Sequence, residues 1–342
     1  MSPDLQKRAR SESTFLASVS RQLTKPKPLP DTIRLTAQVA IITGSNVGLG
    51  FEASRQLLQL GLAHLVMGVR SEAKGDAAAA TLREEFPNAT ISVWVVDMAS
   101  YASIRAFVER CASLPRIDIT ILNAGLTVQR FAAVAATGHE TTVQVNYLST
   151  ALLSILLLPI LKSKNKATTR PPVLTLVGSD STYTAKVDVQ SAAVLQQFDN
   201  PGAYEQFSWY AASKLLLAFF AIQLAEYVDP EEVLVNVVNP GLTKGTGFFG
   251  DMPLIIGFLM RLASFLLARS AEVGASNYVD AVVARGAESH GLFLSDWGVK
   301  PYPEMTYTAE GKAFSERLWD QTMEELRFVD ASKIVDGLKN SR

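Results

Sequence analysis

The chain has 342 residues, of which 48% are hydrophobic and 19% are charged. With 32 Lys and Arg against 33 Asp and Glu, the net charge of −1 excludes the strongly basic surface typical of nucleic-acid binding. The single cysteine, Cys111, excludes an internal disulfide and fits a reducing compartment, so we expect a cytoplasmic protein. Three histidines, His64, His139 and His290, have no metal-ligand spacing, and we predict no metal site.

Residues 1–34 differ from the rest of the chain in being rich in Ser, Lys, Arg and Pro. Residues 25–30 read Lys-Pro-Lys-Pro-Leu-Pro, where the prolines prevent a helix from continuing and favour an extended linker. Two interpretations of the preceding part stay open: a short helix that packs on the domain or on a second subunit, or a loosely ordered arm. We predict an N-terminal extension (1–34), one domain (35–325) and a C-terminal tail (326–342).

Apolar runs then alternate with segments of helical periodicity. Strands are expected at residues 39–43, 64–69, 91–96, 117–122, 173–178, 233–238 and 291–294. Helices are expected at residues 47–60, 71–85, 100–113, 139–162, 208–227 and 271–285, and Pro159 should bend the fourth of these or mark its last turns. The alternation predicts an α/β fold, a doubly wound parallel sheet of about seven strands with helices on both faces.

A glycine-rich turn follows the first expected strand. Residues 43–50 read Thr-Gly-Ser-Asn-Val-Gly-Leu-Gly, between an apolar strand and a helix. Glycines let the backbone approach a pyrophosphate, and the start of the helix offers free N–H groups and partial positive charge. Three glycines in seven residues are more than a tight turn needs, so we predict a dinucleotide site. Its contacts would come from Gly44, Asn46, Val47, Gly48, Leu49 and Gly50.

The end of the second strand bears on the choice of dinucleotide. An acidic residue there would bind the ribose hydroxyls of NAD and repel a 2′-phosphate, but this chain has Arg70. Arginine matches a phosphate in charge and in geometry, and Lys74 follows one turn later. We therefore predict NADP(H) over NAD(H). The alternatives are that Arg70 is only a surface residue, or that Glu72 neutralises it.

Tyr210 and Lys214 lie four residues apart in Tyr-Ala-Ala-Ser-Lys. On a helix this spacing places a phenol and an ammonium group on one face. A free tyrosine has a pKa of about 10, too high for easy proton exchange at neutral pH, and a nearby cation lowers that pKa. The pair therefore predicts an acid/base group for an alcohol oxygen. Taken alone, such a spacing more often marks a core-edge tyrosine beside a solvated lysine.

Five motifs occur in the order in which the short-chain dehydrogenase/reductase family has them, and the chain resembles that family from about Leu35 to Trp319. It is most similar to the retinol-dehydrogenase-like branch and to its fungal members. The resemblance implies a Rossmann fold and an NADP(H)-dependent oxidoreductase. The motifs are the glycine turn, Asn123-Ala124-Gly125, Asn146 in Val-Asn-Tyr, the Tyr210 and Lys214 pair, and Asn239-Pro240-Gly241 followed by Thr243.

The resemblance also implies roles for individual residues. Tyr210 would exchange a proton with the substrate oxygen, while Lys214 would lower the pKa of Tyr210 and hold the nicotinamide ribose. Asn146 would fix a water of a proton relay, and Ser179 would hydrogen-bond the substrate oxygen. Ser181 competes with Ser179, because Ser179 stands further from Tyr210 than the family pattern has it. Further cofactor contacts are implied for Asp97, Met98, Asn123, Ala124, Gly125, Pro240, Gly241 and Thr243.

Three segments keep two interpretations each. Asp97 would contact the adenine amine, as the resemblance implies, or cap the helix that starts near Ser100, or do both. The aromatic insertion at residues 182–208 would line a pocket or only pad the surface. The apolar segment 244–269 would be the family's substrate lid, which implies a hydrophobic substrate, or would also touch a membrane surface. Its continuous apolar run, residues 252–268, is shorter than the ~20 residues needed to span a bilayer.

Two classes of function follow. One is an NADPH-dependent reductase or alcohol dehydrogenase for a hydrophobic carbonyl compound, and the resemblance to fungal members implies a ketone of secondary metabolism. The other is a non-catalytic NADP(H)-binding regulator on the same fold. Regulators of this kind usually lose the tyrosine or the lysine, so we predict the enzyme. Its apolar stretch at residues 152–161 would also allow a homodimer.

Overall fold

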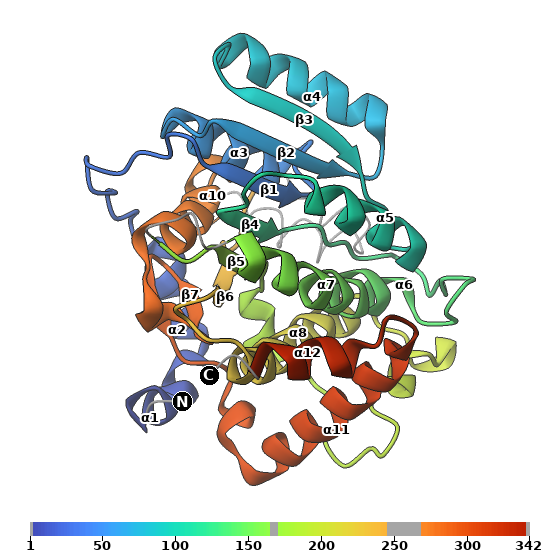
Figure 1. The fold of residues 1–342 in the computed structure, drawn as a ribbon. Helices are drawn as coiled ribbons and strands as arrows, with labels where there is room; N and C mark the ends of the chain where they lie inside the picture. Colours follow the sequence, from blue (N-terminus) through green and yellow to red (C-terminus); the bar gives the residue numbers. More distant parts are fainter. Residues whose placement is uncertain (1–2, 165–169, 245–267, 340–342) are drawn as a thin grey trace.

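The computed structural model describes residues 3–164, 170–244 and 268–339. Its strands form one sheet in the order β3-β2-β1-β4-β5-β6-β7-β8 (Figure 1). Neighbours are parallel throughout, except that β8 pairs antiparallel with β7. The strands are β1 (Val39–Thr43), β2 (His64–Val69), β3 (Thr90–Val95), β4 (Ile119–Leu122), β5 (Val173–Val177), β6 (Leu234–Asn239), β7 (Phe293–Ser295) and β8 (Gly298–Lys300).

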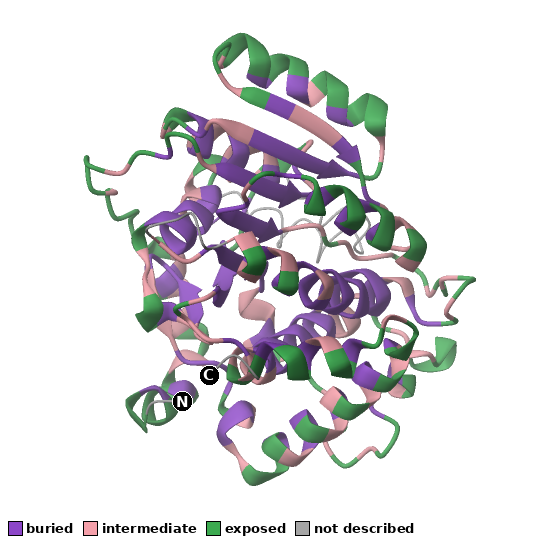
Figure 2. Ribbon diagram, viewed as in Figure 1, coloured by how far each residue is buried: buried purple, intermediate pink, exposed green. Residues whose placement is uncertain are grey.

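Helices cover both faces of this sheet (Figure 1). One face carries α3 (Gly48–Gln59), α4 (Glu72–Glu85) and α10 (Ala271–Val279), which continues as the π-helix η6 (Asp280–Ala284). The other face carries α5 (Tyr101–Ala112), α7 (Ser149–Lys164) and α8 (Gln206–Tyr227). Every residue of β1, β4, β5 and β6 is buried between the two layers, which explains why their sequences are mostly apolar (Figure 2).

The structure confirms the predicted fold class. Each expected strand and helix has a counterpart whose ends differ by two residues or fewer. The helix expected at 139–162 is a composite of α6 (Thr141–Val143), the π-helix η1 (Gln144–Leu148) and α7, and Pro159 marks its last turns. Beyond residue 297 the strand β8 and the helices α11 (Ala309–Glu325) and α12 (Ala331–Lys339) were not predicted, nor were the short 3₁₀ turns η8 (Glu304–Tyr307) and η9 (Arg327–Val329) between them.

The segment that we set apart as a C-terminal tail contains α12, which packs on α7 and α8. Ala331, Val335 and Leu338 of α12 are buried in the same core cluster as α7. The apolar stretch of α7, on which the expected homodimer rested, is therefore largely covered by its own chain, since Leu152, Leu157 and Leu161 are fully buried. The homodimer stays a prediction, but this stretch is not a free surface.

Within the part of the chain that the structure describes, two helices are long and apolar enough, by length and composition, to cross a membrane. They are Thr141–Lys164 and Gln206–Tyr227, and 83% and 67% of their most apolar windows are buried inside the protein. Both lie against the sheet, so packing in the core accounts for their composition.

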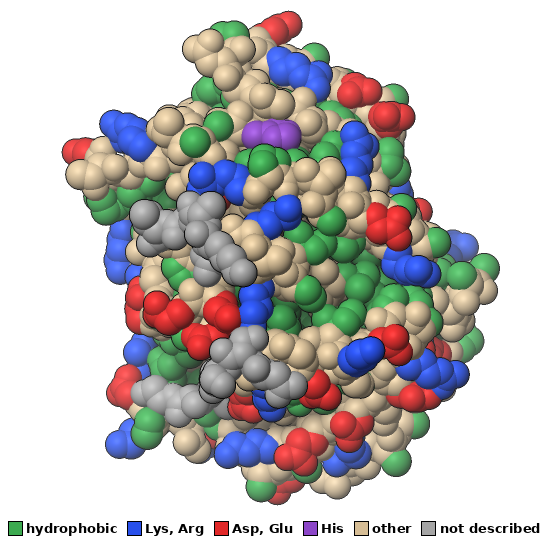
Figure 3. All heavy atoms as spheres, viewed as in Figure 1, with side chains coloured by type: hydrophobic (Ala, Val, Ile, Leu, Met, Phe, Trp, Pro, Cys, Tyr) green, Lys and Arg blue, Asp and Glu red, His purple; other side chains and the backbone are tan. Residues whose placement is uncertain are grey.

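On the face seen in Figure 3, positive and negative side chains are intermixed.

Residues 3–23 form two helices, as the first of our two interpretations of the N-terminal extension expects. These are α1 (Pro3–Glu12) and α2 (Phe15–Leu23), and Thr14 caps α2 by accepting a hydrogen bond from the backbone N–H of Ala17. Residues 24–30 have no regular secondary structure, in line with the prolines. Leu5, Ala9 and Arg21 are buried, so the extension packs on the domain.

The aromatic insertion at residues 182–208 packs against α11 and the start of α8. Phe198 is buried, and its carbonyl accepts a hydrogen bond from Trp209 Nε1 at 2.8 Å. Gln321 of α11 donates to the carbonyl of Ala192 at 2.6 Å. The short 3₁₀ turns of this insertion, η3 (Asp180–Thr184), η4 (Gln196–Phe198) and η5 (Pro201–Ala203), are thus held as part of the domain.

His139 fastens this insertion to the rest of the domain. Its Nδ1 lies 2.9 Å from Asp199 of the insertion, and its Nε2 lies 3.6 Å from Glu325 at the end of α11. The hydrogen bond to Asp199 and the nearby carboxylate of Glu325 raise the pKa of the buried imidazole to about 9. His139 is therefore charged at neutral pH and joins two carboxylates.

We expect the stabilisation by His139 to depend on pH. Since the pKa is higher in the folded than in the unfolded protein, the contribution is complete below pH 6.5 and is lost as the pH rises through 9. His139→Gln should lower the free energy of unfolding by roughly 2 kcal/mol at pH 6 and by much less at pH 9.5, as measured by urea denaturation. His64→Gln is the control, because burial lowers the pKa of His64. A deficit in His139→Gln that is equal at both pH values would contradict the expectation.

Candidate active site

Parallel pairing brings the carboxyl ends of β1, β4, β5 and β6 to one edge of the sheet. The segments that follow these strands are the glycine turn at residues 44–50, residues 123–125, Ser179 and the turn at residues 240–243. The strand order reverses between β1 and β4, and ligands of doubly wound sheets bind at such a switch point. The motifs predicted from the sequence therefore meet at the place where this architecture binds ligands.

Asn123 joins the two strands on either side of the switch point. Its Nδ2 donates to the carbonyls of Thr43 at 2.9 Å and Gly44 at 3.1 Å, at the end of β1. Its Oδ1 accepts a hydrogen bond from the hydroxyl of Tyr278 at 3.1 Å. Ala124 N–H donates to Thr43 Oγ1 at 3.0 Å. The side chain of Asn123 thus holds the backbone at the start of the glycine turn. Asn123 is itself held by Tyr278, a buried tyrosine of α10 that no motif indicated.

The glycine turn needs glycine for two separate reasons. Gly44 and Gly48 have φ values of +66° and +58°, in the left-handed region that side chains disfavour. A Cβ on Gly50 would lie 2.5 Å from the carbonyl oxygen of Gly44 and 2.7 Å from Asn123 Nδ2, closer than atoms can approach. The turn leads directly into α3, whose N-cap residue, Val47, is exposed and provides no side-chain cap. The start of α3 thus presents backbone N–H groups to solvent.

The residues expected at the adenosine end lie around the ends of β2 and β3. Arg70, Glu72 and Lys74 are all exposed, at the end of β2 and in the first turn of α4. The interpretation of Asp97 as a helix cap is wrong: Ser100 caps α5, and Asp97 Oδ1 instead accepts from the N–H of Ala99 at 2.9 Å. Asp97 stands three residues before the N-cap of α5, and its carboxylate closes a local turn to residue 99 instead. Met98 is buried beside Asp97.

Four polar side chains from three elements converge next to residues 123–125. Tyr210 and Lys214 lie in the first part of α8, Asn146 lies in η1, and Ser179 follows β5. The hydroxyl of Ser179 lies close enough to Tyr210 to lower the pKa of its phenol. Lys214 Nζ lies 5.9 Å from the centre of the Tyr210 ring and donates to the carbonyl of Val177 at 2.8 Å. All four predicted catalytic side chains are thus brought together.

The surroundings of Ser179 and Ser181 differ, and they favour Ser179 as the predicted catalytic serine. Ser179 Oγ lies beside Tyr210, whose pKa it lowers, and accepts from the N–H of Ser181 at 3.2 Å. Ser181 Oγ is buried without a hydrogen-bond partner among the described residues. Asn146 uses its side chain within the protein: Oδ1 accepts from the N–H of Leu126 at 2.8 Å, and Nδ2 donates to Ser213 Oγ at 3.0 Å.

Known proteins resemble this chain in sequence and in fold. Residues 38–169 match the family model of the short chain dehydrogenase. The chain is 57% identical over 342 residues, which is 100% of each chain, to the short chain dehydrogenase virL of Hypocrea virens. It is 45% identical over 320 residues, or 93% of each chain, to the short chain dehydrogenase/reductase mfmJ of Annulohypoxylon moriforme.

The chain belongs to the short-chain dehydrogenase family. This confirms the predicted family and its oxidoreductase class. Among solved structures, the NADPH-dependent 3-quinuclidinone reductase of Rhodotorula rubra is similar in fold, with a TM-score of 0.60 and 20% identity over 80% of this chain and 97% of that one. At this identity the likeness concerns the fold alone.

Burial governs the ionisation of the tyrosine and lysine of this short-chain dehydrogenase. Burial raises the pKa of Tyr210 to about 12, and the hydrogen bond from Ser179 lowers it only in part. Burial also lowers the pKa of Lys214 to about 8, so the ammonium form still predominates at pH 7. We expected Lys214 to bring the pKa of Tyr210 down. The structure corrects this for the free protein, because desolvation outweighs the favourable interactions and leaves Tyr210 protonated.

The turn after β6 completes the edge. Gly241 has a φ of +77°, and its N–H donates to Asn239 Oδ1 at 3.1 Å. Thr243 Oγ1 donates to the carbonyl of Gly241 at 3.1 Å, which folds the turn back on itself. The predicted lid, residues 244–269, falls almost entirely on residues 245–267, outside the described residues.

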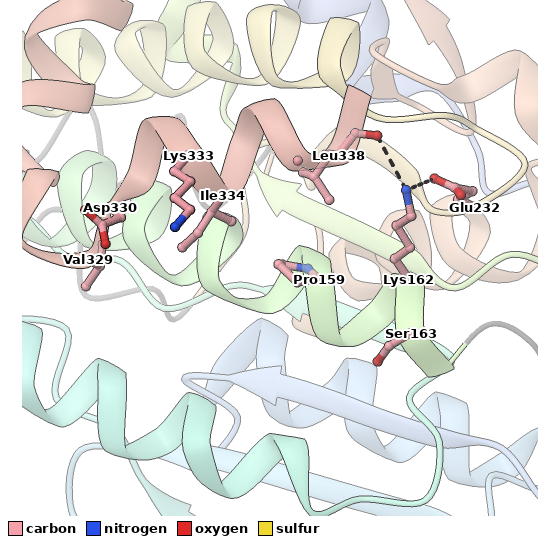
Figure 4. Close-up of a pocket in the computed structure, with 10 residues that line it drawn as sticks. Pro159, Lys162, Ser163, Glu232, Val329, Asp330, Lys333, Ile334 and Leu338 are labelled. Atoms are coloured by element: carbon pink, nitrogen blue, oxygen red, sulfur yellow. Dashed lines mark hydrogen bonds and ion pairs between the residues drawn. The ribbon is translucent and has the colours of Figure 1, made fainter. Parts of the chain in front are cut away.

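A surface groove of about 780 Å³ lies elsewhere, between the C-terminal end of α7 and α12 (Figure 4). It is lined by Pro159, Lys162 and Ile334, among others, and Lys162 pairs with Glu232 at 2.6 Å. Pro159 is 13 residues further along the helix than Asn146, a distance of about 20 Å at helical rise. The groove is therefore remote from the converging side chains.

We expect Gly50→Ala to disrupt the glycine turn. The added Cβ must displace the Gly44 carbonyl or Asn123, and overpacking of this kind costs about 1–3 kcal/mol. The measurement is the urea midpoint of unfolding. Gly337→Ala is the matched control, since it also changes a helical glycine but has no atom within 4 Å of the new Cβ. Equal stability of the two variants would show that the turn tolerates a side chain.

Proposed function

We propose that this short-chain dehydrogenase interconverts a carbonyl and an alcohol on a hydrophobic small molecule and uses NADP(H). One observation carries the proposal: a protonated Tyr210, beside Ser179 and close to Lys214, stands at the sheet edge onto which the glycine turn opens. A hydroxyl pair at this position can transfer a proton to an oxygen and stabilise negative charge on it. A regulator without catalysis would have no use for this arrangement.

The residues at this edge fit a dinucleotide. Gly50 leaves no room for a side chain between the turn and Asn123, and the exposed start of α3 suits a pyrophosphate. The turn at residues 44–50 would hold the pyrophosphate, and Arg70, Lys74 and Asp97 the adenosine end. Residues 123–125 and Lys214 would hold the nicotinamide ribose, and residues 240–243 the nicotinamide. When bound, the cofactor supplies or accepts the hydride.

The protein's own part of the reaction is the transfer of the proton. In reduction, Tyr210 donates its proton to the substrate oxygen as that oxygen gains negative charge, and the Ser179 hydroxyl donates a second hydrogen bond. The phenolate left on Tyr210 is then stabilised by the positive charge of Lys214 nearby. Oxidation of an alcohol uses the same groups in reverse, with Tyr210 accepting the proton.

Removal of the Tyr210 hydroxyl should lower turnover and leave cofactor binding intact. Tyr210→Phe should keep its affinity for NADPH and lose activity by a factor of about 10²–10⁴, the usual contribution of general acid–base catalysis. Affinity is measured by fluorescence titration and turnover by loss of NADPH absorbance with a panel of ketones. Tyr227→Phe, at the other end of α8, is the matched control and should remain active. Undiminished turnover in Tyr210→Phe would remove Tyr210 from the mechanism.

The preference for NADP(H) is supported by the two exposed cations, Arg70 and Lys74, at the end of β2 and the start of α4. The 2′-phosphate of NADP(H) is a dianion that a guanidinium binds through two parallel hydrogen bonds. The 3-quinuclidinone reductase with the same fold is described as NADPH-dependent, which agrees with this preference.

Loss of the Arg70 side chain should weaken the binding of NADPH and leave the binding of NADH almost unchanged. Arg70→Ala should raise the Kd of NADPH by about 10-fold, the effect of one charge-assisted contact, and leave the Kd of NADH within twofold, as measured by titration of nicotinamide fluorescence. Arg105→Ala, which removes an exposed arginine from α5, is the control. Parallel losses for both cofactors would mean that Arg70 does not recognise a 2′-phosphate.

As substrate class we infer a hydrophobic ketone of secondary metabolism. The support is the likeness to fungal short-chain dehydrogenases over the whole chain, together with the apolar composition of the segment that follows Thr243. A panel of apolar ketones that differ in ring size, assayed with NADPH, tests this class against small polar ketones.

A further inference from the structure

The N-terminal helix α2 reaches the active-site edge through a buried arginine. Arg21 is only 4% exposed, and its Nε lies 3.0 Å from Asp180 Oδ2. Asp180 directly follows Ser179, the residue that bonds to Tyr210. A contact across 159 positions of sequence thus ends one residue from the proposed catalytic hydroxyl.

Arg21 is itself fixed from several sides. Its Nη1 donates to the carbonyl and to the Oε2 of Glu12 in α1, both at 2.7 Å, and its guanidinium stacks 4.7 Å from the centre of the Tyr183 ring. Lys300 of β8 reaches Glu12 at 3.4 Å. A guanidinium held in this way has one orientation, so it can fix the position of the carboxylate that it binds.

Asp180 is in turn hydrogen-bonded to the residue at the end of β6. Its Oδ1 accepts from Asn239 Nδ2 at 2.6 Å, and its N–H donates to Asn239 Oδ1 at 3.2 Å. The same Asn239 oxygen accepts the N–H of Gly241. Arg21, Asp180 and Asn239 therefore tie the residue after Ser179 to the turn at residues 240–243.

Gln22, the next residue of α2, binds that turn directly. Its side-chain amide accepts from the N–H of Leu242 at 2.9 Å and donates to the carbonyl of Leu242 at 2.7 Å. Arg269 adds a third link, because it donates both to the carbonyl of Pro240 at 3.2 Å and to the carbonyl of Arg21 at 2.5 Å. Both the N–H and the carbonyl of Leu242 in this turn are thus hydrogen-bonded to α2.

We propose that α2 is a positioning element of the active site, in which Arg21 fixes the backbone that carries Ser179 and Gln22 fixes the turn at residues 240–243. The proposal rests on the proposed function for the roles of Ser179 and of this turn. It assigns different effects to two adjacent residues. Arg21 acts on the proton-transfer site and should govern kcat, whereas Gln22 acts on the nicotinamide end and should govern cofactor affinity.

The kinetic test compares variants of these two residues with matched controls. Arg21→Met should lower kcat at least tenfold and leave the Kd of NADPH within threefold, because it leaves Asp180 beside Ser179 without its counter-charge. Gln22→Ala should raise the Kd of NADPH at least fivefold and leave kcat at saturating NADPH within twofold. Arg10→Met and Gln6→Ala, which change exposed residues of α1, should match the wild-type protein.

A double variant distinguishes positioning from general stabilisation. In Arg21→Met/Asp180→Asn no buried charge is left unpaired, and the new amide can still accept from Asn239, so kcat should return to within threefold of wild type. Recovery would support the positioning role. A loss that persists in the double variant, with a lowered unfolding temperature in both, would mean that Arg21 merely stabilises the fold, and would overturn it.

Amide hydrogen exchange of the free protein gives a readout that needs neither turnover nor cofactor. Exchange should become faster at residues 179–184 in Arg21→Met and at residues 241–243 in Gln22→Ala, with β1 and β4 unchanged. Unchanged exchange at both segments, or faster exchange across every strand, would overturn the proposal. Since this measurement stands apart from activity, failure of the proposed reaction and failure of the positioning role give different results.

Discussion

The parallel register of β1, β4, β5 and β6 is the constraint on which the site depends. Parallel strands that share a register end at one edge, so segments separated by up to 200 residues become neighbours there. Asn123 makes this arrangement rigid at the switch point, because its amide bonds the end of β1 while its own backbone ends β4. A shift in the pairing of β1 with β4 would remove both the shape of the glycine turn and its alignment with Tyr210 and Lys214.

Burial determines the protonation states of Tyr210 and Lys214 at this edge. Desolvation disfavours the charged forms of Tyr210 and Lys214 alike, so it moves their pKa values apart, to about 12 and about 8. Hydrogen bonds from Ser179 and to the carbonyl of Val177 offset only part of that cost. The free protein therefore holds a neutral phenol beside a cation, which is the protonation state that suits reduction of a carbonyl.

Local signals in the sequence predicted most of the fold and the site. Buried parallel strands are continuous apolar runs, and the glycine turn and the Tyr210 and Lys214 spacing are short motifs that need no knowledge of distant partners. The pKa of Tyr210 was mispredicted because spacing reports charge and not desolvation. Tyr278, β8 and the packing of α12 depend on partners far along the chain, and no local pattern specifies which surface a helix covers.

The turn at residues 240–243 shows that α2 and the active site are matched to each other. Gly241 has a left-handed φ, and a Cβ there would lie 2.8 Å from Arg269 and 2.9 Å from Gln22 Oε1. The first property alone would require glycine for any turn of this shape. The second arises only because Gln22 and Arg269 approach the turn so closely. A glycine of this turn is thus constrained by a side chain of the N-terminal extension, so the fit between the two depends on the residues of both.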